Sequence, residues 1–274
     1  MVKSAASSLA GKRIVVTRAT EQTESLCREL EARHALPILF PLIGFAPPDD
    51  FAPLDSALRD LSQFDWLFVT SQNVLRVLLE RSATLALSLA EAAKGLRIAA
   101  VGPSTANAAT DAGLCVSHVA ANHYGLALAE ELEAELLGCH VFLPRSDRAN
   151  PELPEALRRF GVEVTEVIAY RTVRPADPDP ITLAQLSNGE ADAVLFFSPS
   201  AVPHLKELLG ESQFRALHEK AIFTAIGPVT ARSLRDAGVE RIVSASGATA
   251  SAVVCALEEF FSSAKQPLAG VKRA

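Results

Sequence analysis

The sequence predicts an α/β protein built from two similar, doubly wound parallel-sheet domains with a cleft between them. Three observations support this prediction: an internal repeat, a regular alternation of short apolar runs with helix-length segments, and two proline-rich breaks in that alternation. A repeat spaced by 125 residues indicates duplicated domains, because solenoid repeats have periods of about 20–50 residues.

The repeat is a shared order of residues. In each copy Gly-Pro is followed by Thr-Ala and then by Asp-Ala-Gly, beginning at Gly102 and at Gly227. Two further pairs of segments match upstream, 69–72 with 197–200 and 11–18 with 138–145. The matching residues are mostly turn residues, so the duplicated parts are those that we expect to meet a ligand.

Strands are expected where short β-branched or apolar runs stand between helix-length segments. In chain order they are 13–17, 36–40, 66–70, 97–101, 116–119, 140–143, 162–168, 193–197, 221–226 and 241–244. Helices are expected between them, from 21–33, where Leu26 and Leu30 share a face, to 249–261. Strands that alternate with helices predict parallel sheets covered on both faces and joined by right-handed crossovers.

Two segments, 41–53 and 170–180, interrupt this alternation at equivalent places in the repeat. Both are rich in proline and aspartate. Proline fixes φ and disfavours helix before it, which predicts extended connectors. Two arrangements remain open: tandem halves, or a second domain inserted between the two connectors.

Composition limits the partners. The chain has 274 residues and is 49% hydrophobic, which is enough to form two hydrophobic cores. Its net charge of −6 disfavours nonspecific nucleic-acid binding. An anionic small molecule is still compatible, since a local site can be positive. No secretory signal is visible and the most apolar stretch, 83–93, is too short to span a bilayer, so we expect a cytoplasmic protein without membrane contact.

Cysteine and histidine usage predicts neither disulfides nor metal. The four cysteines have no paired spacing and are expected to be buried thiols. They are Cys27, Cys115, Cys139 and Cys255. The six histidines are scattered, which disfavours a metal site. Nothing in the sequence requires more than a monomer.

Polar residues collect at four expected strand-to-helix turns. Ligands of open parallel sheets bind outside the carboxyl ends of the strands, where helix N-termini offer N–H groups to anions. The turn residues that we expect to bind substrate are Thr70, Ser71, Gly102, Ser104, Thr105, Ser198, Ser200, Gly227 and Thr230. The simpler interpretation is that they only cap helices; their symmetric repetition favours a ligand.

Three further side chains are candidates. Arg18 and Arg145 are equivalent in the repeat, and each is expected just past a strand end, where it could form a bidentate pair with a carboxylate. Tyr170 is one of only two tyrosines and is expected at the second connector, where its hydroxyl could donate a proton. A solvated loop arginine and a packing tyrosine are the alternatives. The other tyrosine, Tyr124, is expected to be structural.

Several motifs are missing from the sequence. It contains no G-x-G-x-x-G, no G-x-x-x-x-G-K-[ST] and no G-x-S-x-G, which disfavours dinucleotide, phosphate-loop and serine-nucleophile sites. The remaining polar groups are hydroxyls, backbone amides, arginines and one tyrosine. Such a set suits a polyanion that is held by hydrogen bonds, without a cofactor.

The ordered set of motifs resembles the uroporphyrinogen-III synthase family. The segments that carry the resemblance are VTR at 16–18, TSQN at 70–73, GPST at 102–105, YRT at 170–172, LFFSPSA at 195–201 and AIGPVTA at 225–231. It covers about residues 11–262 in family order. It implies a cofactor-free lyase that cyclises hydroxymethylbilane, a linear tetrapyrrole polycarboxylate, to uroporphyrinogen III with inversion of the terminal pyrrole ring and loss of water.

The resemblance also implies roles and boundaries. Tyr170 matches the family's candidate for assisting hydroxyl departure. The expected arrangement is two flavodoxin-like domains, the first discontinuous, with no counterpart for the tail 262–274. The boundaries are 1–42 plus 174–274 for the first domain and 46–170 for the second, with extended connectors near 41–50 and 168–180. The residues alone leave two alternatives, a non-catalytic two-domain binder of an anionic small molecule and a nucleotide- or phosphate-binding α/β protein.

Overall fold

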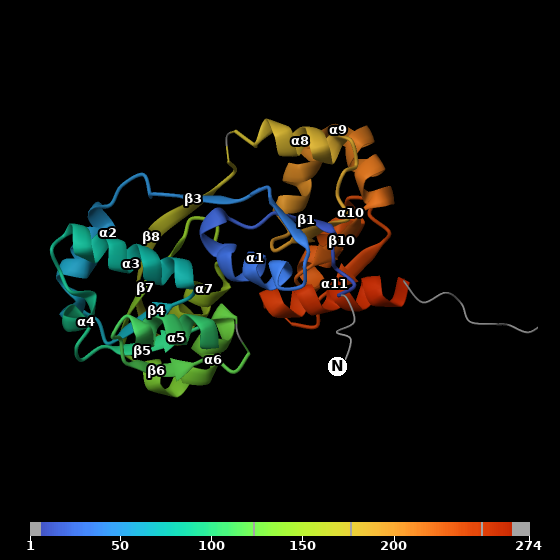
Figure 1. Cartoon of the computed structure of the whole chain (residues 1–274). Helices are drawn as coiled ribbons and strands as arrows, with labels where there is room; N and C mark the ends of the chain where they lie inside the picture. The colour runs from blue at the N-terminus through green and yellow to red at the C-terminus, as the bar shows by residue number, and fades with distance from the viewer. Residues whose placement is uncertain (1–6, 123, 176, 248, 265–274) are drawn as a thin grey trace, which may run out of the picture. The chain divides into compact units, whose positions relative to one another are not determined.

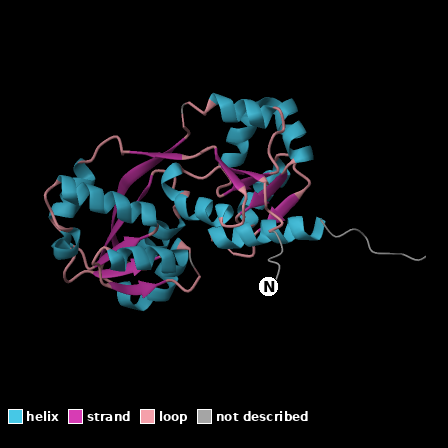
Figure 2. Cartoon of the chain, viewed as in Figure 1, coloured by secondary structure: helices cyan, strands magenta, loops and turns pink. Residues whose placement is uncertain are grey.

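A computed structural model describes residues 7–122, 124–175, 177–247 and 249–264 (Figure 1). The chain divides into two compact units. Unit 1 comprises Met1–Gly44 and Val173–Ala274, and unit 2 comprises Phe45–Thr172. Each unit contains strands and helices in alternation (Figure 2), so the expected α/β class with two parallel sheets is confirmed.

Unit 1 is built on a five-stranded sheet with the order β11-β10-β9-β1-β2, and its neighbouring strands are all parallel. Its strands are β1 (Arg13–Val16), β2 (Leu36–Leu39), β9 (Ala193–Phe196), β10 (Ile222–Ala225) and β11 (Ile242–Ser244). Its helices are η1 (Thr20–Gln22), α1 (Glu24–Glu31), α8 (Pro180–Ser187), α9 (Ala201–Lys220), α10 (Pro228–Asp236) and α11 (Ala250–Ala264). The chain order reverses between β1 and β9, which is the switch point where doubly wound sheets bind ligands.

Both faces of the unit 1 sheet are buried. Ile14 and Val16 of β1 pack with residues of α1 and α11, whereas Val15 between them packs with residues of α8, α9 and α10. A strand buried on both faces is apolar throughout, which explains the run Arg13–Val16. Helix α9 is interrupted at Gly210, whose φ of 74° is a left-handed conformation that favours glycine.

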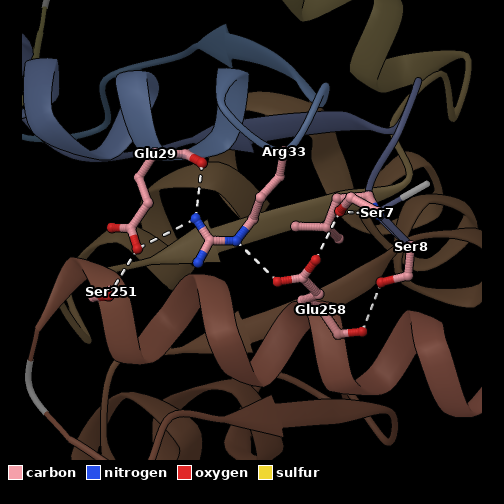
Figure 3. A network of polar contacts seen from close by, with 7 residues as sticks. Ser7, Ser8, Glu29, Arg33, Ser251 and Glu258 are labelled. Atoms are coloured by element: carbon pink, nitrogen blue, oxygen red, sulfur yellow. Dashed lines mark hydrogen bonds and ion pairs between the residues drawn. The ribbon is translucent and has the colours of Figure 1, made fainter. Parts of the chain in front are cut away.

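A polar network holds α11 against α1 and the N-terminal segment (Figure 3). Arg33 donates from Nε to Glu258 at 2.9 Å and forms an ion pair with Glu29 at 3.4 Å. The Ser7 hydroxyl donates to Glu258 at 2.7 Å, and that of Ser251 donates to Glu29 at 2.7 Å. The hydrogen bond from Ser7, together with Arg33, lowers the pKa of Glu258.

Unit 2 is built on a six-stranded sheet with the order β3-β8-β7-β4-β5-β6. Its strands are β3 (Gly44–Ala46), β4 (Trp66–Val69), β5 (Arg97–Ala100), β6 (Val116–Val119), β7 (His140–Ser146) and β8 (Glu163–Val173). Its helices are α2 (Ala52–Arg59), η2 (Leu61–Gln63), α3 (Gln72–Thr84), α4 (Leu89–Ala92), α5 (Pro103–Asp111), α6 (Gly125–Leu136) and α7 (Glu152–Arg159). Strand β4 is also buried on both faces: Leu67 and Val69 face α2–α5, and Trp66 and Phe68 face α6 and α7.

The two sheets have the same spatial order but a different chain order. Read from one edge, β11-β10-β9-β1-β2 of unit 1 corresponds to β6-β5-β4-β7-β8 of unit 2. In unit 2 the strands equivalent to β1 and β2 come last in the chain, because β7 and β8 follow β6. The units are therefore circular permutants of one arrangement. This is why the sequence repeat matches 11–18 with 138–145 although these segments stand at opposite ends of their units.

Several element boundaries differ from those expected from the sequence. The segment 41–53 contains β3 and the start of α2, and β8 continues to Val173, because these two strands hydrogen-bond to each other and satisfy their backbone groups. The segment 21–33 is split between η1 and α1. Helix α11 continues to Ala264, beyond the expected end at 261, and the rest of the predicted tail, 265–274, lies outside the described residues.

The cysteines are free, as expected, but they are not buried: Cys115 and Cys255 are exposed and Cys27 and Cys139 are half-buried. In the described part of the chain, every helix is too short or too polar to cross a bilayer.

Candidate functional site

The carboxyl edge of the unit 1 sheet contains Arg18, two residues after β1 ends. Its Nε donates to Oε1 of Gln22 at 2.8 Å, and its guanidinium lies over the Phe197 ring, 5.3 Å from the centroid. Burial lowers the pKa of Arg18. Among the described residues, no carboxylate forms an ion pair with it. A partly desolvated cation without a counterion is suited to bind an anion.

The turn before α10 lies two strands from β1 in the same sheet. Gly227 is the N-cap and supplies no side-chain cap. Its φ of −175° is extended backbone that any residue adopts, and a Cβ built on it would meet no atom within 4 Å. Neither conformation nor packing requires glycine here. Because glycine has no side chain, the N–H groups of the first turn of α10 stay accessible to a ligand.

The turn before α9 lies between these two features. The hydroxyls of Ser198 and Ser200 are 2.8 Å apart, and the Ser200 backbone N–H donates to Ser198 Oγ at 3.3 Å. Ser233 of α10 donates to the Pro199 carbonyl oxygen at 3.0 Å, which joins the two turns. The structure therefore brings Arg18, Ser198, Ser200 and Gly227 to one edge of unit 1.

An equivalent edge exists in unit 2. Thr70 and Ser71 follow β4, and Ser71 caps α3 by accepting from the Val74 N–H at 3.2 Å. Gly102 caps α5 without a side-chain hydrogen bond, and the neighbouring Ser104 is exposed. The capping interpretation thus describes Ser71, whereas α9 after Ser200, α5 after Gly102 and α10 after Gly227 have no side-chain cap hydrogen bond.

Two of the predicted turn residues, Thr105 and Thr230, are almost completely buried. They occupy the third positions of α5 and α10 and are only 4% and 3% exposed. Each can present only a small part of its side chain to a ligand.

Arg145 is not placed where the sequence predicted. Strand β7 continues through Ser146, so Arg145 lies inside the strand and is 5% exposed. It donates to Oε1 of Glu166 and to the Asn150 carbonyl oxygen, both at 2.8 Å. The strand is longer than its repeat counterpart because β8 continues beside it. Arg145 therefore already has a carboxylate partner, unlike Arg18.

Tyr170 lies on β8 directly after a break in register. Arg145 pairs with Ile168 and Ser146 pairs with Tyr170, so β8 contains one extra residue, Ala169. A bulge of this kind shifts the alternation of the strand, and Tyr170 packs against the same core face as Ala169. Its ring meets Phe45 edge-on, with centroids 5.3 Å apart. Among the described residues its hydroxyl has no hydrogen-bond partner.

A cavity of about 230 Å³ lies beside Tyr170 within unit 2. Phe45, Phe51, Arg76 and Arg81 line it together with Tyr170. Sequence reasoning missed these four residues, because they come from the connector and from α3 and belong to no motif. It also missed Phe197 as the ring under Arg18, although its place directly after β9 was a signal. In the described ranges, no three His, Cys, Asp or Glu side chains could jointly hold a metal ion.

Residues 6–255 match the family described as uroporphyrinogen-III synthase HemD. The chain belongs to the uroporphyrinogen-III synthase family. Uroporphyrinogen-III synthase is a cofactor-independent lyase that cyclises hydroxymethylbilane in tetrapyrrole biosynthesis. The family resemblance seen in the motifs is thereby confirmed.

Curated relatives carry the same family name, and two solved structures of the family share the fold. The chain is 27% identical to the uroporphyrinogen-III synthase of Synechococcus elongatus, covering 81% of this chain and 85% of that protein. It is also 27% identical to a putative uroporphyrinogen-III synthase of Methanothermobacter thermautotrophicus, covering 84% and 91%. In fold, it is similar to the uroporphyrinogen-III synthetase of Helicobacter pylori, with a TM-score of 0.64 at 17% identity, covering 92% and 99%. It is likewise similar to a mutant uroporphyrinogen III synthase of Thermus thermophilus, with a TM-score of 0.57 at 24% identity, covering 91% and 100%.

Proposed function

We propose that this protein converts hydroxymethylbilane to uroporphyrinogen III, with inversion of the terminal pyrrole ring and loss of water. Arg18 and the turns at the carboxyl edges of the two sheets bind the carboxylates of the bilane, and Tyr170 assists departure of the hydroxyl group. Membership of the family supports the reaction. The geometry of this chain supports the roles of the residues.

The observation that carries the proposal is that the carboxyl edge of the unit 1 sheet combines an arginine and a helix N-terminus, neither of which is paired with a carboxylate among the described residues. The Arg18 guanidinium stacks on Phe197 and has no carboxylate partner among the described residues. The first turn of α10 has no side-chain cap and contains no acidic residue. A helix N-terminus and an unpaired guanidinium at one sheet edge together favour a ligand with several carboxylates.

Tyr170 suits a proton-donating role because its hydroxyl is not used within unit 2. The reaction breaks the C–O bond of the hydroxymethyl group, and the oxygen leaves as water when it gains a proton. A phenol that donates a hydrogen bond to this oxygen makes it a better leaving group. The carbon that has lost the hydroxyl group then bonds to the substituted α-carbon of the terminal ring and forms a spiro intermediate. The bond from that α-carbon to its former bridge breaks, and the bridge bonds instead to the other α-carbon, which loses its proton, so the ring is inverted. The protein contributes by holding the two ends of the chain together.

Product analysis tests the proposal. Hydroxymethylbilane closes by itself to the type I isomer, without inversion. Purified protein is mixed with the bilane, the reaction is quenched early, and the ratio of type III to type I uroporphyrin is measured after oxidation. We expect type III to dominate. Type I alone, at the rate seen without protein, would reject the assignment, and bound bilane with type I product would instead support a non-catalytic binding protein.

The domain boundaries, the oligomeric state and the cellular compartment are part of the same proposal. We infer that the two units correspond to the domains expected at 1–42 plus 174–274 and at 46–170, and that the enzyme acts as a monomer in the cytoplasm. The mass of the particle in light scattering tests the monomer, and fractionation of cells tests the compartment.

A further inference from the structure

The cavity beside Tyr170 contains two arginines that differ in how they are held. Arg81 forms a bidentate pair with Asp55, at 2.5 and 2.6 Å, and its guanidinium stacks on Phe51, 4.2 Å from the ring centroid. Its side chain and that of Asp55 are largely buried. Arg81 is therefore committed to the wall of the cavity and holds Phe51 in place.

Arg76 has a different environment. Its Nε and Nη2 donate to Oδ1 of Asn73 at 3.2 and 2.9 Å, which orients the guanidinium. Its Nη1 donates to both carboxylate oxygens of Glu80, at 2.8 and 3.0 Å. Glu80 is one turn further along α3 and its side chain is 61% exposed. An exposed pair of this kind is weak, so another carboxylate can take the place of Glu80.

The other walls suit a flat ring. Phe45 and Tyr170 stand edge to face, with an interplanar angle of 83°, and Phe51 lies under Arg81. Pockets for drug-sized ligands have volumes of about 300–1,000 Å³, and this cavity of about 230 Å³ is smaller. It has room for a single substituted ring and not for a tetrapyrrole.

We propose that this cavity is a subsite for one carboxylate-bearing pyrrole ring, with Arg76 as the anchor of the carboxylate and Tyr170 at the edge of the ring. Glu80 occupies the anchor in the free protein and is displaced by the ligand. The proposal rests on the proposed function, since it identifies the ring as one of the four in hydroxymethylbilane. The bilane supplies both the flat ring and the carboxylate that the cavity can accept.

A monopyrrole tests the subsite separately from catalysis. Binding of pyrrole-3-propionate to the full chain is measured by NMR titration for the wild type, Arg76→Gln, Glu80→Gln and Arg159→Gln. Arg159 is an exposed arginine of the same unit and serves as the matched control. We expect about tenfold weaker binding for Arg76→Gln, as for loss of a charged hydrogen bond. Glu80→Gln should bind about twofold more tightly, because the competing carboxylate is gone.

Two results would overturn the subsite: no saturable binding to the wild type, or equal binding by the wild type and Arg76→Gln. A purely structural Arg76–Glu80 pair would make both variants weaker, whereas the subsite requires opposite changes. In turnover of hydroxymethylbilane, Arg76→Gln should raise KM about tenfold with little change in kcat. If the wild type yields type III product while probe binding is unaffected by Arg76, the subsite fails and the proposed function stands. If the probe results hold but only type I forms, the proposed function fails.

Discussion

Ser146 of β7 is the register partner of Tyr170, although its neighbour Arg145 is paired with Ile168. The extra residue, Ala169, turns Tyr170 towards the face of the sheet that α3 covers. Regular alternation would have placed Tyr170 on the face of Ile168. The position of the one candidate proton donor therefore depends on a local irregularity of the strand.

Replacement of Tyr170 by phenylalanine keeps the ring contact with Phe45 and removes the hydroxyl. We expect kcat to fall by about 10²-fold, within the range for loss of a general acid, with an unchanged thermal midpoint. Steady-state kinetics and a melting curve measure both. Tyr124→Phe is the matched control, because Tyr124 is 49% exposed and its side chain makes no cap hydrogen bond at the start of α6. Near-full activity of Tyr170→Phe would reduce this residue to a packing role.

Replacement of Gly227 by alanine places a methyl group in open space before α10. The free energy of unfolding should change by less than about 1 kcal/mol, since the weaker N-cap is offset by a less flexible unfolded chain. The KM for hydroxymethylbilane should rise several-fold because the methyl group takes space through which a carboxylate would approach the first turn of α10. Unchanged kinetics would mean that no substrate group approaches this helix.

Replacement of Arg18 by glutamine removes the cation over Phe197. We expect KM to rise about tenfold, as for loss of a charged hydrogen bond, and kcat to change less. Arg28→Gln is the control, because Arg28 lies on the exposed surface of α1 and pairs with the equally exposed Glu24. A fall in kcat with constant KM would instead place Arg18 in the chemical step.

Arg145→Gln should show the opposite profile to Arg18→Gln. Its guanidinium bonds to Glu166 and to a backbone carbonyl inside unit 2, so its loss should lower the free energy of unfolding by about 2 kcal/mol. The KM of the folded enzyme should stay within about twofold. Denaturant titration combined with kinetics distinguishes this outcome from a substrate-binding role.

The Glu258 network predicts a pH-dependent contribution to stability. Its pKa is lowered in the folded state by the bonds from Ser7 and Arg33. The contribution is therefore complete above the unfolded pKa of about 4.3 and is lost as the pH falls through the folded value. We expect Glu258→Gln to cost about 1 kcal/mol at pH 7 and almost nothing near pH 3. Glu259→Gln, on the exposed side of α11, should be neutral at both pH values.

Much of the fold could be predicted from the sequence, because strands buried on both faces are continuous apolar runs. Trp66–Val69 and Ala193–Phe196 are of this kind. The ends of β7 and β8 could not be predicted in the same way, since these strands extend only where they pair with each other. Because the expected strand ended at residue 143 and β7 continues to Ser146, Arg145 was predicted after the strand and lies inside it.

One part of the candidate site could be predicted from the sequence and another part could not. The turns after β4, β5, β9 and β10 have recognisable glycine and hydroxyl signatures. The Tyr170 cavity has none, because its lining comes from β3, α3 and β8 and depends on a bulge that no residue type marks. Short sequence motifs carry no information about contacts between segments that are far apart in the sequence, so they could not predict this cavity.

The pairing of β3 with β8 has a consequence for the order of assembly. These strands are the first and last of unit 2, and they are hydrogen-bonded neighbours. Once unit 2 has folded, the chain segments before Phe45 and after Thr172 begin one strand spacing apart. The entropy of closing that long loop has then already been lost within unit 2. Pairing of β1 with β9 then costs about as little entropy as closing a short loop. We therefore expect unit 2, which is inserted in the sequence of unit 1, to fold first and to favour the folding of unit 1.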